Sequence, residues 1–586
     1  MFKLFKNLTK KDLLYVVICI TLIVFQVWLE LKMPDYMSEI TRLVQTEGSK
    51  MKDIIEQGVY MLLCAGGSLI SAVVVGYFAA QVASSFSANI RLKIFKKIQE
   101  FGIQEMKKFQ TSSLITRTTN DVNQVEMLIG MGLQVMAKAP IMAVWAIMKI
   151  LNKGVEWSIL TAVCVVVLLI TVGILMAIVL PKFSIVQKLI DKINGVTREN
   201  LTGIRVIRAF NAEKNQAERF EKVNNELTKT QMFNQRCLSV MFPIMNLVMQ
   251  NLTLGIYIIG AILINKAGML DKLKLFSNMV VFSSYGMQVI MSFLMLAVIF
   301  MMWPRSEVSA KRINEVLDEE IAIKSGEFKG KTNEVGTIEF KNVSFKYPDA
   351  DEYLLKDISF KANKGDTIAF IGSTGSGKST LINLIPRFYD ATDGEVLVDG
   401  INVKKYDETA LHNKIGYISQ KAIMFTGTVK ENVSYGNNGK KKPTDEEIKK
   451  AIEVAQGNEF VEKMDGKYDA HIARGGTNVS GGQKQRLSIA RAIARNPEIY
   501  IFDDSFSALD YKTDATLRKE LKKYTKDATS VIVAQRIGTI INADKIIVLD
   551  KGHCVGQGIH KELLKKCKVY KEIALSQLSE EELKNA

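Results

Sequence analysis

Residues 372–380 read GSTGSGKST, and this run decides the fold of the chain around it. An apolar segment, 367–371 (TIAFI), precedes it, and another, 381–385 (LINLI), follows it. The pattern GxxxxGK[ST] between a strand and a helix predicts a loop whose glycines let the backbone curl around a phosphate and aim amide N–H groups at it. The alternative is a glycine-rich turn without a ligand. The predicted phosphate-binding residues are Gly372, Ser373, Thr374, Gly375, Ser376, Gly377, Lys378, Ser379 and Thr380.

A metal-bound nucleotide is the expected ligand of this loop. Lys378 would neutralise the β- and γ-phosphates of ATP, and the Ser379 hydroxyl would bind Mg²⁺. A second apolar strand, 499–502 (IYIF), ends in Asp503 and Asp504. A carboxylate at the C-terminal end of a buried strand lies where the metal should sit, so Asp503 is predicted to be the acid on the metal side. Taken alone, two acids after a strand also suit a helix-capping turn.

A second anion-binding segment is predicted at residues 478–486, which read NVSGGQKQR before a helical stretch. Its serine, glycines and glutamine offer small donors at a helix start. Because one phosphate loop needs only one nucleotide, a second such segment suggests that nucleotide sites are shared between two chains. A plain helix N-cap is the alternative interpretation.

The N-terminal half is apolar and predicts a membrane domain. Six runs of about 20 residues or more are long enough for a helix to cross a hydrocarbon layer ~30 Å thick. Charged residues inside them are few, so no dedicated ion path is expected. The predicted spans are 13–33, 58–83, 127–151, 158–180, 241–265 and 276–303.

Lysines predict the orientation. Lys3, Lys6, Lys10 and Lys11 precede the first span, whereas acids dilute the basic residues after it, so the N-terminus is expected in the cytoplasm. Six spans return the chain there. The long inward connections, 84–126 and 182–240, are expected to be helical extensions that dock a soluble partner; the alternative is a solvated amphipathic helix.

Past residue 303 the composition changes. Residues 304 to about 335 are hydrophilic, and strand and helix patterns then alternate. We therefore expect an all-α transmembrane domain over 1–305, a linker over 306–335 and a cytoplasmic α/β P-loop ATPase domain over 336–586.

Composition narrows the class of protein. The chain has 586 residues, 48% of them hydrophobic, which excludes intrinsic disorder and a small single-domain protein. Its formal net charge of +16 suits nucleic acid, anionic lipid or nucleotide phosphates. The six predicted spans argue against nucleic acid. Six cysteines without CxxC spacing indicate neither a disulfide scaffold nor a zinc site.

The order of motifs along the C-terminal half carries a resemblance. The phosphate loop is followed by Gln420, by VSGGQ at 479–483, by the strand ending at Asp503 and Asp504, and by SALD at 507–510. This order resembles the nucleotide-binding domain of an ATP-binding cassette (ABC) transporter. With six preceding spans, the whole chain resembles an exporter half in which one polypeptide joins one membrane domain to one cassette.

The resemblance implies a role for each motif. Tyr347 would stack on adenine; an edge-strand tyrosine is the alternative. Gln420 would reach Mg²⁺ and sense the membrane domain, and Asp510 would link the two sites of a dimer, unless it is a salt-bridged surface residue. The signature would close over the ATP of the opposite cassette, with Val479 in place of the usual leucine. Its residues are Ser480, Gly481, Gly482 and Gln483.

Besides Val479, three residues depart from the family pattern. Asp504 replaces the glutamate that orients the attacking water, which withdraws the carboxylate by ~1.5 Å, and a misplacement of ~1 Å can cost ~10²-fold in rate. Gln535 replaces the histidine near the γ-phosphate, and a neutral amide cannot carry the imidazolium charge. Arg474 reverses a charge just before the signature, near the contact between cassette and membrane domain that the resemblance implies, so it bears on coupling and not on nucleotide binding.

These departures predict one half of a heterodimeric ATPase-coupled exporter. Its own ATP site would be degenerate, and its signature would complete the catalytic site of a companion half-transporter. A slow homodimer, an importer with the same fold and an ATP-gated channel or regulator are the alternatives. Amphipathic small molecules, lipids or peptides are the cargo that the resemblance implies, and the sequence does not choose among them.

Overall fold

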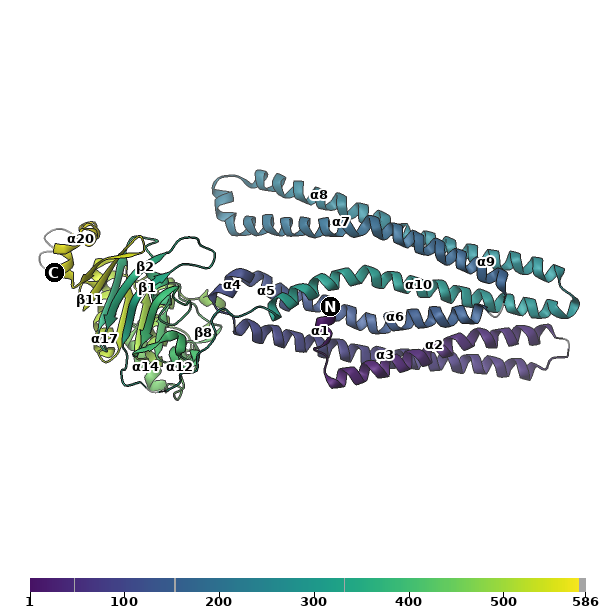
Figure 1. The fold of residues 1–586 in the computed structure, drawn as a ribbon, viewed down its shortest axis with the longest axis horizontal. Helices are drawn as coiled ribbons and strands as arrows, with labels where there is room; N and C mark the ends of the chain where they lie inside the picture. The colour runs from purple at the N-terminus through teal and green to yellow at the C-terminus, as the bar shows by residue number, and fades with distance from the viewer. Residues whose placement is uncertain (47, 152–153, 331, 579–586) are drawn as a thin grey trace. The chain divides into compact units, whose positions relative to one another are not determined.

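The computed structural model describes residues 1–586 except 47, 152–153, 331 and 579–586. The chain forms two compact units (Figure 1). The membrane unit contains Met1–Glu100 and Phe109–Glu320, and the ATPase unit contains Phe101–Lys108 and the chain from Ile321 onward. A short segment of the N-terminal half therefore belongs to the ATPase unit.

The membrane unit is built from helices alone among its described residues. Six helical segments are long and apolar enough to cross a membrane, and each contains one predicted span, which confirms the all-α membrane domain. Helices suit this environment because all their backbone hydrogen bonds are made internally. The elements are α1 (Phe2–Phe5), α2 (Lys10–Gln45), α3 (Met51–Gln99), α5 (Thr111–Thr118), α6 (Asn120–Leu151), α7 (Val155–Ala209), α8 (Glu213–Ser239), α9 (Met241–Lys266) and α10 (Met269–Leu317).

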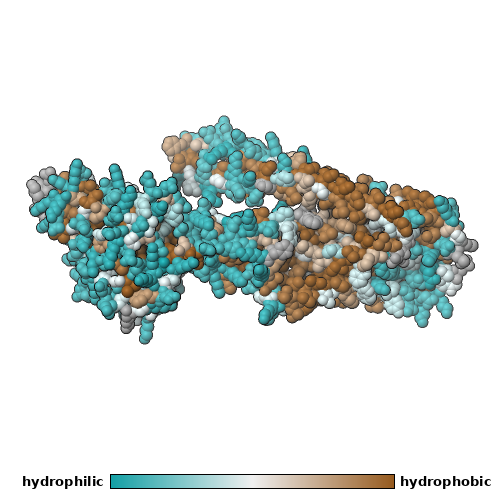
Figure 2. All heavy atoms as spheres, in the orientation of Figure 1, coloured by the Kyte–Doolittle hydropathy of each residue, from teal (hydrophilic) through white to brown (hydrophobic). Residues whose placement is uncertain are grey.

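Apolar side chains cover the outside of these helices as well as their inside. Figure 2 shows them gathered over the membrane unit, with polar side chains toward the helix ends. Where the helices meet, Trp157, Phe282 and Tyr285 are fully buried, and the Trp157 indole donates to the Ile256 carbonyl at 3.2 Å. The apolar exterior is expected of a protein whose solvent is lipid.

Two helices continue well past the apolar spans. α3 extends to Gln99, and α7 extends to Ala209, where a short turn leads into α8. α7 and α8 lie side by side as a helical arm (Figure 1). At its tip the Phe210 side chain is 79% exposed. An exposed aromatic ring at the end of a charged arm suits contact with another protein.

The ATPase unit contains two larger sheets. A four-stranded antiparallel sheet has the order β2-β1-β4-β5, and a six-stranded sheet has the order β12-β11-β3-β10-β9-β6. A small ribbon pairs β7 with β8. The strands are β1 (Ile338–Phe345), β2 (Leu355–Ala362), β3 (Thr367–Gly372), β4 (Asp393–Val398), β5 (Ile401–Asn402), β6 (Ile415–Ile418), β7 (Gly427–Thr428), β8 (His471–Ile472), β9 (Ile499–Asp503), β10 (Thr529–Val533), β11 (Lys545–Asp550) and β12 (His553–Gly558).

Helices flank the six-stranded sheet, and apolar cores fill both of its faces. Buried side chains of β1, β2 and β4 share one core with β3 and α11, whereas α14, α16 and α17 contribute to the other. The helices are α4 (Ile103–Phe109), α11 (Lys378–Asn383), α12 (Glu408–Asn413), α13 (Val429–Val433), α14 (Asp445–Val454), α15 (Asn458–Val461), α16 (Gly481–Arg495), α17 (Tyr511–Tyr524), α18 (Ile537–Ile540), α19 (His560–Lys566) and α20 (Lys568–Leu575).

The strand order places the predicted site. β10 lies between β3 and β9 and runs parallel to both, with Val533 opposite Phe370 on one side and Asp503 on the other. The carboxyl ends of these three strands therefore meet at one edge of the sheet, where parallel α/β sheets bind ligands. The phosphate loop, Asp503 with Asp504, and Gln535 all follow directly from this edge.

Candidate functional site

The phosphate loop connects β3 to α11 in a conformation that needs glycine. Gly375 and Gly377 have φ values of +85° and +94°, in the left-handed region that other residues rarely adopt. A Cβ on Gly377 would also lie 2.6 Å from Leu355 Cδ2. The two glycines therefore allow the tight turn that the sequence of the loop predicts.

Lys378 lies across the mouth of this loop. Its Nζ donates to the carbonyl oxygens of Gly372 and Ser373, both at 2.8 Å, and lies 3.4 Å from Ser376 Oγ. Burial lowers the pKa of Lys378, partly offset by the charges of Asp504 and Asp503. The ammonium is held by weak neutral acceptors, and a phosphate would supply the counter-charge that it lacks.

Asp503 and Ser379 form the part of the site that fits Mg²⁺. Ser379 Oγ donates to Asp503 Oδ1 at 2.8 Å, and the Tyr417 hydroxyl lies 3.4 Å from Asp503 Oδ2. Burial raises the pKa of Asp503, and the Ser379 hydrogen bond opposes that shift. A carboxylate beside a hydroxyl is the hard oxygen set that Mg²⁺ prefers, and a cation there would relieve the penalty of burying the charge.

Asp504 departs from the family pattern and contacts a second departure, Gln535. Gln535 Nε2 donates to Asp504 Oδ2 at 2.8 Å, and Gln420 Nε2 approaches the same oxygen at 3.4 Å. Asp504 is 8% exposed, has a φ of +48°, and donates its amide to the Val533 carbonyl at 3.1 Å. Two glutamine amides therefore hold one oxygen of this carboxylate inside the protein.

Tyr347 lies beside the phosphate loop. Its hydroxyl is 2.9 Å from Thr380 Oγ1, and its ring meets the rings of Phe345 and Tyr389 edge to face. Lys107 Nζ lies 4.7 Å from the centre of the Tyr347 ring, a cation–π distance. A hydrogen bond to Tyr389 raises the pKa of Lys107. Sequence reasoning missed Lys107 because nothing in a charged connecting segment indicates which lysine meets an aromatic ring.

The signature residues lie outside this cluster. Ser480 is the N-cap of α16, where its hydroxyl accepts the Gln483 amide at 3.3 Å and Gln483 Oε1 accepts the Ser480 amide at 2.8 Å. Among the described residues, no hydrogen bond links them to the phosphate loop. Gly481 is exposed and Gly482 packs near the Ala508 carbonyl. The capping interpretation thus describes their contacts within one chain.

Asp510 also caps a helix. Its Oδ1 accepts the Thr513 amide at 2.9 Å at the start of α17, and this bond lowers the pKa of Asp510. Arg474 is exposed in a single 3₁₀ turn, Arg474–Gly476. Like the signature, these two residues are turned toward the outside of the chain and not toward its own phosphate loop.

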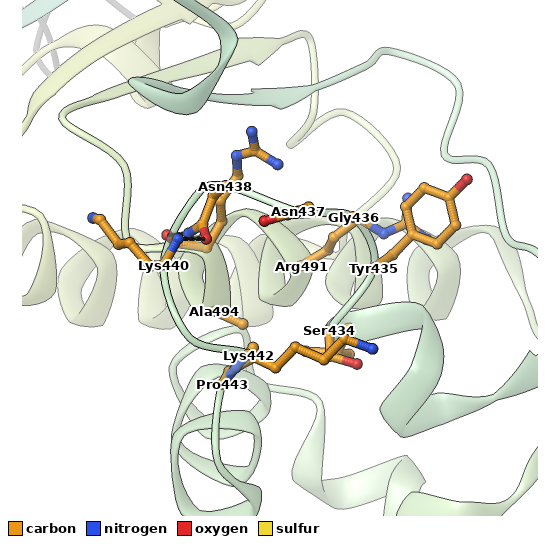
Figure 3. A pocket seen from close by; sticks show the side chains of 12 residues that line it. Ser434, Tyr435, Gly436, Asn437, Asn438, Lys440, Lys442, Pro443, Arg491 and Ala494 are labelled. Carbon is orange, nitrogen blue, oxygen red and sulfur yellow. Dashed lines mark hydrogen bonds between the residues drawn. The ribbon is translucent and has the colours of Figure 1, made fainter. Parts of the chain in front are cut away.

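A cavity lies apart from the predicted residues. It has a volume of about 210 Å³, and Tyr435, Lys440, Lys442 and Arg491 are among its lining residues (Figure 3). Arg491 is held by the carbonyls of Asn432 at 2.8 Å and Ile423 at 3.1 Å. None of the predicted nucleotide-binding residues lines this cavity.

The fold and the site together define a membrane-embedded protein with an ATPase domain. The sequence profile described as ABC transporter matches residues 355–507, and the profile described as ABC transporter transmembrane region matches residues 13–303. The chain belongs to the ABC transporter family. It is a multi-pass membrane protein with a cytoplasmic ATP-binding domain, and it combines one membrane domain and one ATPase domain as exporter halves do.

Curated relatives resemble the chain over nearly its whole length. An uncharacterized ABC transporter ATP-binding protein of Mycobacterium tuberculosis is 37% identical over 92% of this chain and 93% of that protein. A multidrug resistance ABC transporter ATP-binding and permease protein of Lactococcus lactis is 30% identical over 88% of this chain and 85% of that protein. These relatives confirm the predicted ABC transporter class.

A solved structure confirms the fold. The chain superposes on a bacterial Atm1-family ABC exporter with ATP bound with a TM-score of 0.83, covering 98% of this chain and 100% of that one. Sequence identity with that protein is 21%, so this likeness concerns the fold alone.

Proposed function

We propose that this ABC exporter half works with a different companion half, and that its own ATP site holds nucleotide with little hydrolysis. The observation that carries the proposal is the Gln535–Asp504 hydrogen bond of 2.8 Å. A general base must reach the water that it activates. Here the carboxylate that follows Asp503 belongs to Asp504, which is one methylene shorter than glutamate, and one of its oxygens already accepts an amide proton.

The same residues support nucleotide binding. Lys378, Ser379 and Asp503 keep the residue types and geometry for phosphate and Mg²⁺. Tyr347 would receive adenine, and Gln420 would move from Asp504 toward the metal. ATP would then bind with its phosphates in the loop, while the attacking water would lack a well-placed base.

The signature would serve the companion. The signature matches the family pattern at Ser480, Gly481, Gly482 and Gln483 and departs from it at Val479. Among the described residues, no hydrogen bond joins the signature to the phosphate loop of its own chain. Completing a site on another chain is the function left for them. That chain would supply its own glutamate and histidine, so most hydrolysis would occur there.

Binding of two ATP molecules would bring the two ATPase domains together. ATP can change the membrane domains only through its different affinity for the closed and open pairs. The arm of α7 and α8, with the exposed Phe210, is suited to carry that change to the companion's ATPase domain. The cargo would be amphipathic, namely a small molecule, lipid or peptide.

The proposal is tested by comparing the isolated chain with the complex. The full-length chain is purified alone and together with a candidate companion half-transporter from the same source, and phosphate release is measured in lipid nanodiscs. We expect ATP binding but slow turnover alone, and fast turnover in the complex that survives Asp504→Asn. Fast turnover by the isolated chain that is abolished by Asp504→Asn would establish the homodimer instead.

Two further alternatives are separated by transport in inside-out vesicles. An exporter accumulates cargo in the vesicle against a gradient when ATP is added. An importer moves cargo in the opposite direction, and an ATP-gated channel only dissipates a gradient. Matched vesicles without added ATP control for passive leak.

A further inference from the structure

Three of the four charged residues in the predicted membrane spans form ion pairs, and the fourth, Lys32, lies 5.8 Å from the centre of the Trp28 ring. The six predicted spans contain four charged residues, which are Glu30, Lys32, Lys138 and Lys149. Lys138 Nζ lies 2.8 Å from Glu30 Oε1, and Lys149 Nζ lies 2.7 Å from Asp35 Oδ2, just beyond the first span. Both acids are on α2 and both lysines on α6, so the two pairs form one seam between these helices.

Neutral polar groups complete the seam. Glu30 Oε1 also accepts Gln26 Nε2 at 2.9 Å and, from α3, Ser68 Oγ at 3.0 Å. On α10, the Tyr285 hydroxyl lies 2.8 Å from Asp35 Oδ1. Gln288 Nε2 points at the Glu30 carbonyl at 3.4 Å, while its Oε1 is buried without a hydrogen-bond partner among the described residues. Groups from four helices thus converge on two carboxylates.

Helix packing does not require these charges. α2, α6 and α10 already meet in an apolar core that contains Ile23, Val27, Ala146 and Phe282. Well-packed apolar residues often stabilise a buried interface as well as an ion pair does, and charges inside a bilayer are costly and usually mark function. Glu30 and Lys138 are 15% and 19% exposed, so the inner pair is largely removed from the surface of the chain.

The sign of the charges indicates the ligand. In the two ion pairs the α2 side is negative and the α6 side is positive, and the charges of these four groups sum to zero. A purely cationic or anionic ligand would satisfy one side and leave the other buried and unpaired. A head group with both charges can replace both partners at once, its cation facing Glu30 and the free Gln288 oxygen, and its anion facing Lys138.

We propose that the seam between α2 and α6 binds the head group of a zwitterionic amphiphile, which is the transported molecule. This assignment rests on the export function proposed above and names the class of cargo within it. Glu30 and Lys138 are its specificity-determining residues, and the surrounding apolar helices accept the acyl or alkyl chain.

Equilibrium binding without ATP tests the assignment, so its failure is distinct from failure of the heterodimer. The full-length chain is placed in nanodiscs of phosphatidylglycerol, which supplies no zwitterionic head group. Four labelled probes of equal chain length are compared: an alkylphosphocholine, an alkyl sulfobetaine, an alkyltrimethylammonium and an alkyl sulfate. We expect one of the two zwitterions to bind with an affinity about 10-fold or more above that of either singly charged probe. Equal binding of all four overturns the proposal.

Variants identify the residues. Glu30→Gln and Lys138→Gln should each weaken zwitterion binding by about 10-fold or more, because each leaves one charge of the head group unpaired. Glu39→Gln is the matched control, since Glu39 is on the same helix but pairs with Arg42 at the exposed surface. An equal loss in the control would show that the effect is not specific to the seam.

A charge exchange separates a binding site from a structural clamp. Glu30→Lys combined with Lys138→Glu keeps an ion pair but reverses the charges of the two sides, so thermal stability should return toward that of the native chain. Phosphocholine and sulfobetaine carry their charges in opposite order along the head group. The exchanged variant should therefore prefer whichever zwitterion the native chain disfavours. Restored stability with an unchanged preference would show a clamp and overturn the proposal.

Discussion

At the scale of single residues, the predicted ATP site keeps the residue types of the phosphate-loop pattern and has Asp504 where the family pattern has glutamate. Lys378 donates to carbonyls of its own loop, and Ser379 donates to Asp503; their binding of phosphate and Mg²⁺ stays a prediction. Asp504 and Gln535 replace two residues of the family pattern and bind each other instead of leaving a free carboxylate. Binding and hydrolysis should therefore respond separately to substitution.

Restoring the family residues should restore hydrolysis. Asp504→Glu together with Gln535→His returns the missing methylene and removes the amide from the carboxylate. We expect phosphate release by the complex, measured with the companion's own catalytic glutamate replaced by glutamine, to rise about 10²-fold, since misplacement of ~1 Å accounts for a loss of that size. Adding Asp503→Asn to the double variant should abolish the gain. No gain in the double variant would place the defect elsewhere.

Asp503 should lower the folding stability of the chain when no Mg²⁺ or nucleotide is bound. Burial raises its pKa above the ordinary 3.8, so the stability linked to this group is present below that pH and is lost as the pH rises through the raised pKa. Without Mg²⁺ and nucleotide, Asp503→Asn should raise the melting temperature at pH 7 by a few degrees, and the difference should vanish in acid. Thermal unfolding at a series of pH values checks this, with the exposed Asp465→Asn as control.

At the scale of elements, the local sequence predicts the helices and the phosphate loop, but it does not predict the contacts between separate elements. Apolar runs predict the six helices because lipid selects for length and hydrophobicity, and the glycine pattern predicts the loop because φ values such as +94° at Gly377 exclude most other residues. The Gln535–Asp504 bond and the Lys138–Glu30 pair join residues from separate elements. No local sequence pattern predicts contacts between separate elements. The sequence alone therefore shows each charge in the spans as a single polar residue.

Ser480 has two proposed roles at the start of α16: it caps the helix, and it completes the ATP site of the companion. Ser480→Ala removes a capping box from α16 and should destabilise the chain by about 1 kcal/mol. It should also lower hydrolysis by the complex with the companion half, while ATP binding to this chain persists. Thr444→Ala removes the same kind of cap from α14 and is the matched control. Equal losses of hydrolysis in both variants would mean that Ser480 acts only as a cap.

At the scale of the whole molecule, the long helical arm offers a contact that the chain itself does not use. Phe210 at its tip is 79% exposed, and burial of such a ring in a companion would supply much of the contact energy. Phe210→Glu should reduce transport by the assembled complex about 10-fold or more without changing ATP binding. Leu201→Glu, on an exposed position along the shaft of the same arm, should leave transport unchanged; equal loss there would remove the special role of the tip.

The short segment Phe101–Lys108 belongs to the ATPase unit although the chain before and after it belongs to the membrane unit. Glu105 accepts the Ala322 amide at 3.0 Å, and Lys107 lies on Tyr347. The polypeptide thus passes from one unit to the other three times, and cutting it once does not free either part. A protease site inserted after Glu320 should yield fragments that stay together through affinity purification, and Glu105→Ala with Lys107→Ala should let them separate.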